Sequence, residues 1–194
     1  ESGDVLYIVD LAGSTSTDGC VYLNSLPLAQ EGKASPVPCR DWASLSTSQR
    51  VALNASGEHV YTGSLAGDTT SNLVIIKNST LFRQEGDTLP DIAPWKLTGF
   101  GSAPVDIDDV GNVLWFGDWD DPDTSRDQGL FLNGALLVQE GVQTIAFAPS
   151  RVRVELLLRY LRDALPSRLG EPPKIHGYRG GYLPKERRAV EHRL

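Results

Sequence analysis

A tripeptide repeated at nearly constant spacing constrains the fold of this 194-residue chain more than any other feature. Gln-Glu-Gly occurs at 30–32, 84–86 and 139–141, so the copies lie 54 and 55 residues apart. An Asn stands six residues before each Gln, giving the segments NSLPLAQEG, NSTLFRQEG and NGALLVQEG. Self-similarity at such a period is the signature of a repeat architecture. The residues that define the repeat are Asn24, Gln30, Glu31, Gly32, Asn78, Gln84, Glu85, Gly86, Asn133, Gln139, Glu140 and Gly141.

Each repeat predicts four antiparallel strands. VALNASGEHVY is typical of strand, turn and strand, because Asn54 and Gly57 tolerate a positive φ. A polar loop, a third strand, a tight Asn-Ser or Asn-Gly turn and a fourth strand follow, and Asn133-Gly134 is the strongest hairpin signal. We expect an all-β repeat domain over 1–148, with units at about 1–32, 43–86 and 97–141. The first unit retains only Glu1-Ser2-Gly3 of the opening element, so the chain is expected to begin just inside a repeat.

The order of N/D-x-x-G, strand, loop, strand, N-[SG] turn and QEG resembles the tandem repeats of bacterial exported β-propeller-like proteins. The resemblance covers about residues 1–145 and implies blade-like sheets that stack on one another, in a periplasmic, extracellular or cell-surface protein. Val74, Ile76, Leu130 and Leu132 are expected between the sheets. Because closed propellers typically need at least four blades, three units predict a partial or open propeller. Its open sheet edges could pair with other chains.

The balance of charge changes near residue 150. Residues 1–150 carry a net charge of −13, whereas residues 151–194 carry +6. Apolar residues at helical spacing from Val154 to Leu165 predict an amphipathic helix that ends at Pro166, followed by a loose basic tail, within 149–194. This segment could pack on a sheet edge, arise from a shifted reading frame or a fusion, or bind an anionic surface. The acidic remainder disfavours nucleic-acid binding, and no apolar run is long enough to span a membrane.

An acidic loop is the densest cluster of charge. Its alternating carboxylates could ligate Ca²⁺, the one cofactor that the sequence suggests, or could simply be solvated. Trp119 lies in this loop and is the candidate for a surface contact such as a sugar ring, with core packing as its other interpretation. The carboxylates are those of Asp118, Asp120, Asp121, Asp123 and Asp127.

Other candidate residues carry weaker signals. Cys20 and Cys39 could form a disulfide in an exported protein, or remain free thiols. The repeated Glu31, Glu85 and Glu140 are expected to cap strands, because a catalytic group is rarely repeated in every unit. Asp106 and Asp108 are unrepeated carboxylates that could serve as an acid/base pair. Trp115 is expected in the core and His59 at the surface.

These features predict a non-enzymatic, exported β-repeat scaffold or interaction module that contacts a protein or carbohydrate surface. The alternative is a truncated propeller-type enzyme acting on glycans, as a hydrolase or lyase. A third hypothesis is nucleic-acid binding through the basic residues 151–194, which would depend strongly on salt.

Overall fold

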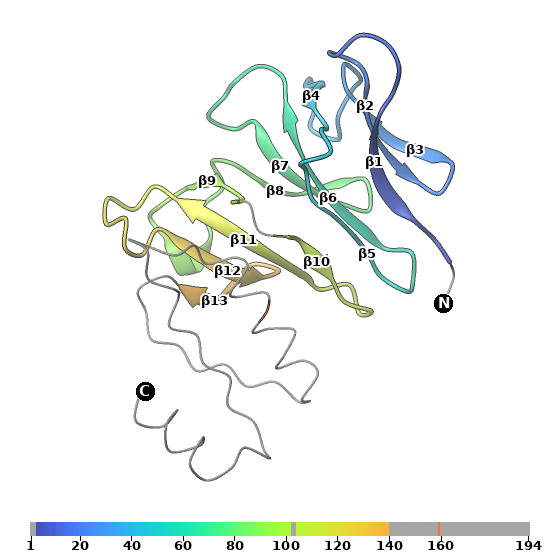
Figure 1. The fold of residues 1–194 in the computed structure, drawn as a ribbon. Coiled ribbons are helices and arrows are strands. Elements are labelled where there is room, and N and C mark those ends of the chain that lie inside the picture. Colours follow the sequence, from blue (N-terminus) through green and yellow to red (C-terminus); the bar gives the residue numbers. More distant parts are fainter. Residues whose placement is uncertain (1–2, 102–103, 140–158, 160–194) are drawn as a thin grey trace. The chain divides into compact units, whose positions relative to one another are not determined.

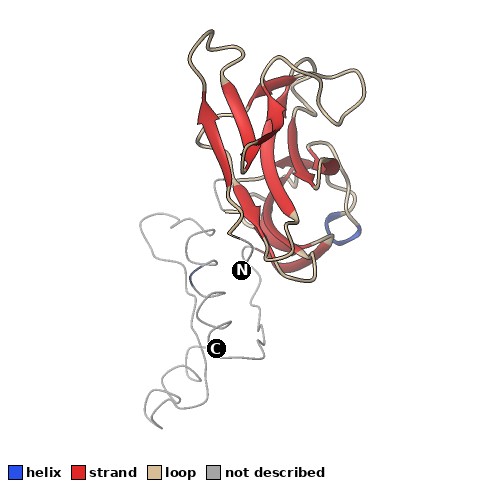
Figure 2. Ribbon diagram, turned by 90° about the vertical axis from the view of Figure 1, so that its right-hand side faces the viewer, coloured by secondary structure: helices blue, strands red, loops and turns tan. Residues whose placement is uncertain are grey.

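The computed structural model describes residues 3–101, 104–139 and Arg159. The compact unit Glu1–Val142 contains three antiparallel β-sheets, and a second unit comprises Gln143–Leu194. Figures 1 and 2 show the strands of the first unit with one short 3-10 helix, Pro90–Ile92. The helix and tail predicted for 149–194 lie outside the described residues, apart from Arg159. In the part of the chain that is described, no helix could cross a membrane.

The strands follow one another through the three sheets in chain order. The first sheet consists of β1 (Leu6–Asp10), β2 (Gly19–Leu23) and β3 (Leu26–Gln30). The second consists of β4 (Trp42–Ser44), β5 (Val51–Leu53), β6 (His59–Leu65), β7 (Leu73–Lys77) and β8 (Thr80–Gln84). The third consists of β9 (Leu97–Gly99), β10 (Asp106–Ile107), β11 (Val113–Trp119), β12 (Gln128–Leu132) and β13 (Ala135–Gln139).

The strand register confirms the threefold repeat. Strands β2, β7 and β12 begin at Gly19, Leu73 and Gln128, so they keep the 54- and 55-residue spacing of the Gln-Glu-Gly elements. Each pairs with the next strand, and each pairing skips one residue at the same position. A β-bulge at an equivalent position bends each sheet in the same way. The skipped residues are Leu28, Phe82 and Leu137.

The number of strands per sheet differs from the prediction of four. The first sheet has three, because its described residues contain no counterpart of β5 and β10. The other two have five, since the short strands β4 and β9 pair with β6 and β11. The sheets that the described residues form do not close into a propeller.

Trp42 and Trp95 do not occupy equivalent positions, although they stand twelve and thirteen residues before Asn54 and Asp108. The Trp42 backbone exchanges hydrogen bonds with Gly32 and Lys33, and Leu97 makes the same pair of bonds with Gly86 and Asp87. Leu97 is therefore the counterpart of Trp42, and Trp95 lies two residues earlier.

Two hydrophobic clusters join the sheets. Val21 and Ala29 of the first sheet pack with Tyr61 of the second. Val60 and Ile75, which alternate with Tyr61 and Ile76 along the strands, pack with the third sheet instead. The second sheet is therefore covered on both faces, and burial raises the pKa of Tyr61 to about 12.

Trp115 is fully buried in the cluster that joins the second and third sheets, as predicted. Val74 and Ile76 lie between sheets as expected. Leu130 and Leu132 do not belong to either cluster, because their neighbour Phe131 points toward the second sheet.

The repeated Gln and Glu side chains bind the main chain. The Gln side-chain amide donates to the carbonyl oxygen thirteen residues earlier in all three units: Gln30 to Thr17, Gln84 to Ser71 and Gln139 to Arg126. Buried Glu31 accepts from Gly19 N at 3.1 Å and from Leu45 N at 2.7 Å, which joins the first unit to the second. Glu85 accepts from Asn72 N and Leu73 N. Glu140 and Gly141 lie outside the described residues.

The repeated Asn side chains fasten each hairpin to the strand before it. All three have a positive φ, between 49° and 56°. Their Oδ1 atoms accept from Val5 N, His59 N and Val113 N, each at 2.9 Å. Their Nδ2 atoms donate to the side chain of the residue just before each of these donors, namely Asp4, Glu58 and Asn112. The three are Asn24, Asn78 and Asn133.

Candidate functional site

The acidic segment begins at Asp118, within β11, and hydrogen bonds join it to the residues around β9. Asp118 Oδ2 accepts from Gly101 N at 3.0 Å, and Asp120 Oδ1 accepts from Lys96 N at 2.7 Å. These bonds tie the loop to the segment on either side of β9. Burial, followed by the nearby charge of Asp127, raises the pKa of Asp118, although its bond from Gly101 acts in the opposite direction.

The five predicted calcium ligands do not form a metal centre. Among the described residues, no three His, Cys, Asp or Glu side chains are grouped so that they could hold a metal ion. Asp121 and Asp123 instead pair with Arg126. Calcium binding here stays a prediction that this geometry does not support.

Trp119 lies at the end of β11 and not in the loop, and only 3% of it is exposed, which agrees with core packing and not with a surface contact. Its ring packs edge-on against Phe131, with 5.9 Å between the centroids. The reason is the alternation of β11, which places Trp115 and Trp119 on the same buried face.

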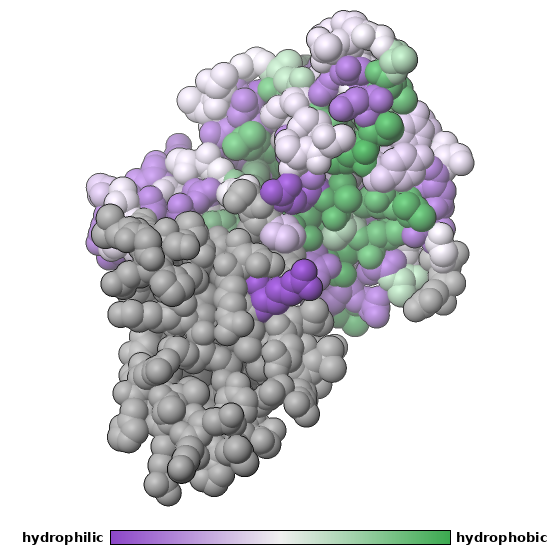
Figure 3. Space-filling view, viewed as in Figure 1, coloured by the Kyte–Doolittle hydropathy of each residue, from purple (hydrophilic) through white to green (hydrophobic). Residues whose placement is uncertain are grey.

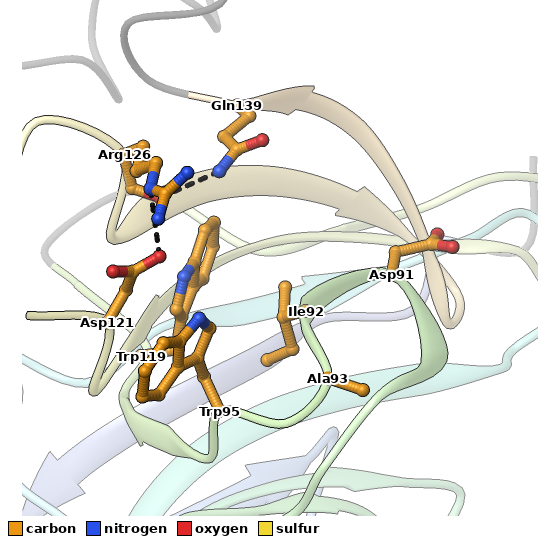
Figure 4. A pocket seen from close by; sticks show the side chains of 8 residues that line it. All are labelled: Asp91, Ile92, Ala93, Trp95, Trp119, Asp121, Arg126 and Gln139. Atoms are coloured by element: carbon orange, nitrogen blue, oxygen red, sulfur yellow. Dashed lines mark hydrogen bonds and ion pairs between the residues drawn. The ribbon is translucent and has the colours of Figure 1, made fainter. Parts of the chain in front are cut away.

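Trp119 and Trp95 together line a hollow of about 180 Å³, which we call the tryptophan pocket. Figure 4 shows the two indoles with the Arg126–Asp121 pair beside them and the Asp91 and Ile92 side chains across the hollow. The segment before β9 contributes Asp91, Ile92 and Trp95, and the loop before β12 contributes Arg126. The pocket therefore joins parts of the chain that are distant in the sequence.

An ion pair fixes the polar wall of the pocket. Arg126 Nε lies 3.0 Å from Asp121 Oδ2, and the Asp121 side chain is only 4% exposed, whereas that of Arg126 is 52% exposed. Asp121 Oδ1 also accepts from Asp123 N. Gln139 donates to the Arg126 carbonyl oxygen, which is the repeated contact of the Gln-Glu-Gly element. The guanidinium group thus offers charge to solvent at the rim.

At the position equivalent to Trp95, the second sheet has an arginine, Arg40. Arg40 stands two residues before Trp42, as Trp95 stands two residues before Leu97. Its guanidinium donates to the carbonyl oxygens of Ala66, Asp68 and Ser71, and so occupies the loop after β6. In the third sheet a tryptophan takes this place, and the tryptophan pocket lies beside it.

Other candidate residues are Cys20, Cys39, Asp108 and His59. Cys20 is buried and Cys39 exposed, both as free thiols, and burial raises the pKa of Cys20. Asp108 accepts bonds from Val110 N and Asn112 N within its turn. His59 is 9% exposed, so the expected surface position is wrong; its ring stacks on Tyr61.

Comparison with known proteins identifies no family. No protein-family model matches the chain, and no solved structure does. A stretch of 53 residues is 55% identical to part of the uncharacterized ATP-dependent helicase YprA of Bacillus subtilis strain 168. This match covers 27% of the present chain and only 7% of the length of that helicase.

Sequence reasoning gave no signal for three of the residues that line the pocket. Asp91, Ile92 and Arg126 carry no motif, and they come together only through the sheet, whereas Gln139 belongs to the Gln-Glu-Gly repeat. The third sheet has Trp95 where the second sheet has Arg40, and this difference could have pointed to the pocket. The two positions can be matched, however, only with the strand register that the structure supplies.

Proposed function

We propose that this chain is a non-enzymatic β-repeat interaction module of an exported protein, built from propeller-blade-like units, and that it binds a carbohydrate at the tryptophan pocket. The observation that carries the proposal is the departure of this pocket from the repeat. Arg40 fills the equivalent position in the second sheet, whereas Trp95 lines a hollow in the third.

The use of the polar side chains supports a scaffold with one specialised site. Repeated side chains such as Gln84, Glu85 and Asn78 bind the main chain, so they serve the architecture. The side chains that differ between units include Trp95, Asp121 and Arg126, which line the pocket.

The size and chemistry of the pocket favour one sugar ring. Its volume of about 180 Å³ is below the roughly 300–1,000 Å³ typical of drug-sized ligands, so it suits a single ring or side chain. The accessible part of the half-buried Trp95 indole can pack against the apolar side of a pyranose, and the half-exposed Arg126 guanidinium can donate to its hydroxyls. A protein side chain is the other occupant that the pocket would fit.

Intrinsic tryptophan fluorescence of the full chain, titrated with a panel of mono- and oligosaccharides, tests this proposal. We expect saturable binding that Trp95→Ala weakens at least about tenfold and that Trp95→Phe partly retains. Trp95 is half-buried, so its replacement is less disruptive than that of Trp119. The matched control is Arg40→Ala at the equivalent position of the second sheet, which should leave the affinity unchanged.

Two results would contradict the proposal. Saccharides that bind equally well to Trp95→Ala would place the site elsewhere. Turnover of a glycan that is abolished by Asp121→Asn would instead support the alternative, a truncated propeller-type glycan hydrolase or lyase, since Asp91 and Asp121 would then supply the carboxylates.

A second candidate function is nucleic-acid binding through residues 151–194. The net charge of +6 of these residues favours it. A stretch of the chain also matches a protein named as a helicase. Binding of labelled single-stranded DNA should then weaken steeply between 50 and 200 mM salt, and Arg151→Gln with Arg153→Gln should reduce the salt dependence. Binding that is insensitive to salt would contradict this candidate.

A further inference from the structure

The first sheet exposes a position that the other two sheets bury completely. Tyr7, Tyr61 and Trp115 are equivalent, because each is the partner of the equivalent residue in the neighbouring strand: Tyr22, Ile76 and Phe131. Tyr7 is 39% exposed, whereas Tyr61 and Trp115 are 0% exposed.

The same contrast recurs at both ends of the strand. Leu11 is 38% exposed, and its counterparts Leu65 and Trp119 are 1% and 3% exposed. Val5 is 56% exposed, and its counterparts His59 and Val113 are 9% and 0% exposed. We call the surface formed by Val5, Tyr7, Leu11 and Tyr22 the uncovered face. Figure 3 shows hydrophobic residues on the side of the molecule where β1 and β2 lie.

In the second and third sheets, this face is covered by the sheet that precedes it. Tyr61 is buried beneath Val21 and Ala29 of the first sheet. Trp115 is buried beneath Val60 and Ile75 of the second. The covering residues are aliphatic and the covered residue is aromatic in both cases. Tyr7 continues this series, so the surface complementary to it is an aliphatic sheet face.

The edge of β1 is also open at a defined register. In the second sheet, Val51, Ala52 and Leu53 pair with Tyr61, Val60 and His59. The equivalent residues are Tyr7 and Leu6 of β1 and Val5 just before it, and among the described strands β1 pairs only with β2. Strand β10 holds the corresponding place on β11. An unpaired strand edge is a template for one more strand.

We propose that the uncovered face and the open edge of β1 together dock one further sheet of this same repeat. That sheet covers Tyr7 with aliphatic side chains, as Val21 and Ala29 cover Tyr61. The segment that follows it adds a short strand to β1, with apolar residues at its first and third positions and Asn or Asp after them, as in Val51–Leu53 with Asn54. The identity of the partner rests on the proposed stacking of repeat units and is independent of the tryptophan pocket.

An in-register duplication tests the proposal on the full chain. Residues 1–57 are followed by residues 4–194, which inserts 54 residues, the repeat period, and joins Gly57 to Asp4 as it is joined to Glu58 in the parent. The inserted copy supplies both the covering sheet and the missing strand. We expect the Leu6 and Ile8 amides of the downstream copy to exchange at least about 100-fold more slowly than in the parent, as pairing protects them.

The same substitution in each copy gives an internal control. Tyr7→Lys in the inserted copy lies on the new uncovered face, and it should leave the denaturation midpoint unchanged. Tyr7→Lys in the downstream copy lies beneath the new sheet, and it should lower the midpoint clearly. Equal effects in the two copies, without amide protection, would overturn the proposal.

Two further measurements keep the test decisive. If the duplicated chain does not fold, residues 49–57 placed directly before Asp4 supply the strand alone, and protection of Leu6 and Ile8 is still expected. Unchanged exchange in that variant would overturn the strand register. The competing occupant is a second copy of the whole chain, and sedimentation of the parent chain tests for it. A dimer that Tyr7→Lys dissociates would show that the second copy occupies the uncovered face. That result would overturn the proposed partner. Loss of saccharide binding would leave all these results unaffected.

Discussion

The side-chain oxygen of Asn78 accepts a hydrogen bond from the main-chain amide of His59 at 2.9 Å, nineteen residues earlier in the chain. The hairpin that ends one strand therefore holds the first residue of the strand before it. Asn24 and Asn133 make the same contact at the same distance. The turn residue thus performs two tasks, because it also adopts the positive φ that the turn requires.

Replacement of this Asn should separate the two tasks. Asn78→Ala loses the bond and places a Cβ at a positive φ, so we expect a loss of about 2 kcal/mol in the free energy of unfolding. Asn78→Gly loses the bond but tolerates the φ of 49°, and should cost about 1 kcal/mol. Urea denaturation of both variants measures the difference. Equal losses would show that the backbone conformation contributes little.

Glu31 should matter more than Glu85, because its carboxylate is buried and joins two units. Glu31→Ala leaves the Gly19 and Leu45 amides without an acceptor, with an expected cost of about 2–4 kcal/mol. Glu85→Ala, whose carboxylate is only half-buried, should cost about 1 kcal/mol. Parallel denaturant titrations compare the two variants, and a larger loss for Glu85→Ala would contradict this ranking.

Gly63 leaves room for an indole. A Cβ at this position would lie 2.6 Å from the Trp42 ring and 2.8 Å from Leu45. We expect Gly63→Ala to cost about 1–3 kcal/mol through overpacking. Trp42→Phe combined with Gly63→Ala should cost less than the sum of the single changes, because the smaller ring frees space. Additive costs in this double-mutant cycle would argue against the contact.

The Arg126–Asp121 pair should respond asymmetrically. Arg126→Met leaves a buried carboxylate without its cation, and we expect a loss of about 1–2 kcal/mol, moderated because Arg126 is half exposed. Asp121→Asn retains an acceptor for Asp123 N and leaves Arg126 hydrated, so it should cost less. Thermal denaturation of the two variants and of the double variant provides the comparison. A greater loss in Asp121→Asn would show that the carboxylate has another role.

Asp118 should destabilise the fold when it is ionised. Burial raises its pKa in the folded state, so its contribution is most favourable below the unfolded pKa and is lost as the pH rises through the folded pKa. Asp118→Asn keeps an acceptor for Gly101 N without the charge. The variant should therefore gain stability relative to the parent between pH 4 and 7, roughly the window above the ordinary Asp pKa. A difference that is constant over this range would contradict the assignment.

The repeat could be predicted from the sequence because it is encoded locally. Gln-Glu-Gly, the Asn turns and the strands between them recur with the same spacing, and hydrogen bonds such as Gln84 to Ser71 span only thirteen residues. Strands β4 and β9 escaped prediction because three residues are too few to display an alternation. The connection from Gly86 to Leu97 is one residue longer than that from Gly32 to Trp42, so counting residues along the chain does not identify Leu97 as the counterpart of Trp42.

The candidate site was less accessible to prediction. Trp119 was placed in a loop because aspartates follow it, although the alternation of β11 buries it. The acidic loop suggested calcium from its composition alone, but Asp118 and Asp120 accept bonds from the main chain. Such bonds depend on which backbone amides the fold brings near, and this information is absent from the local sequence.

The exchange of Arg40 for Trp95 has a consequence for how such chains diversify. The side chain at this position acts outside the strands themselves, on the loop that follows the long central strand of each unit. A change there can create or close a recess while the faces that hold neighbouring sheets stay as they were. A binding site can thus arise in one unit while the packing between the sheets, and with it the fold, stays the same.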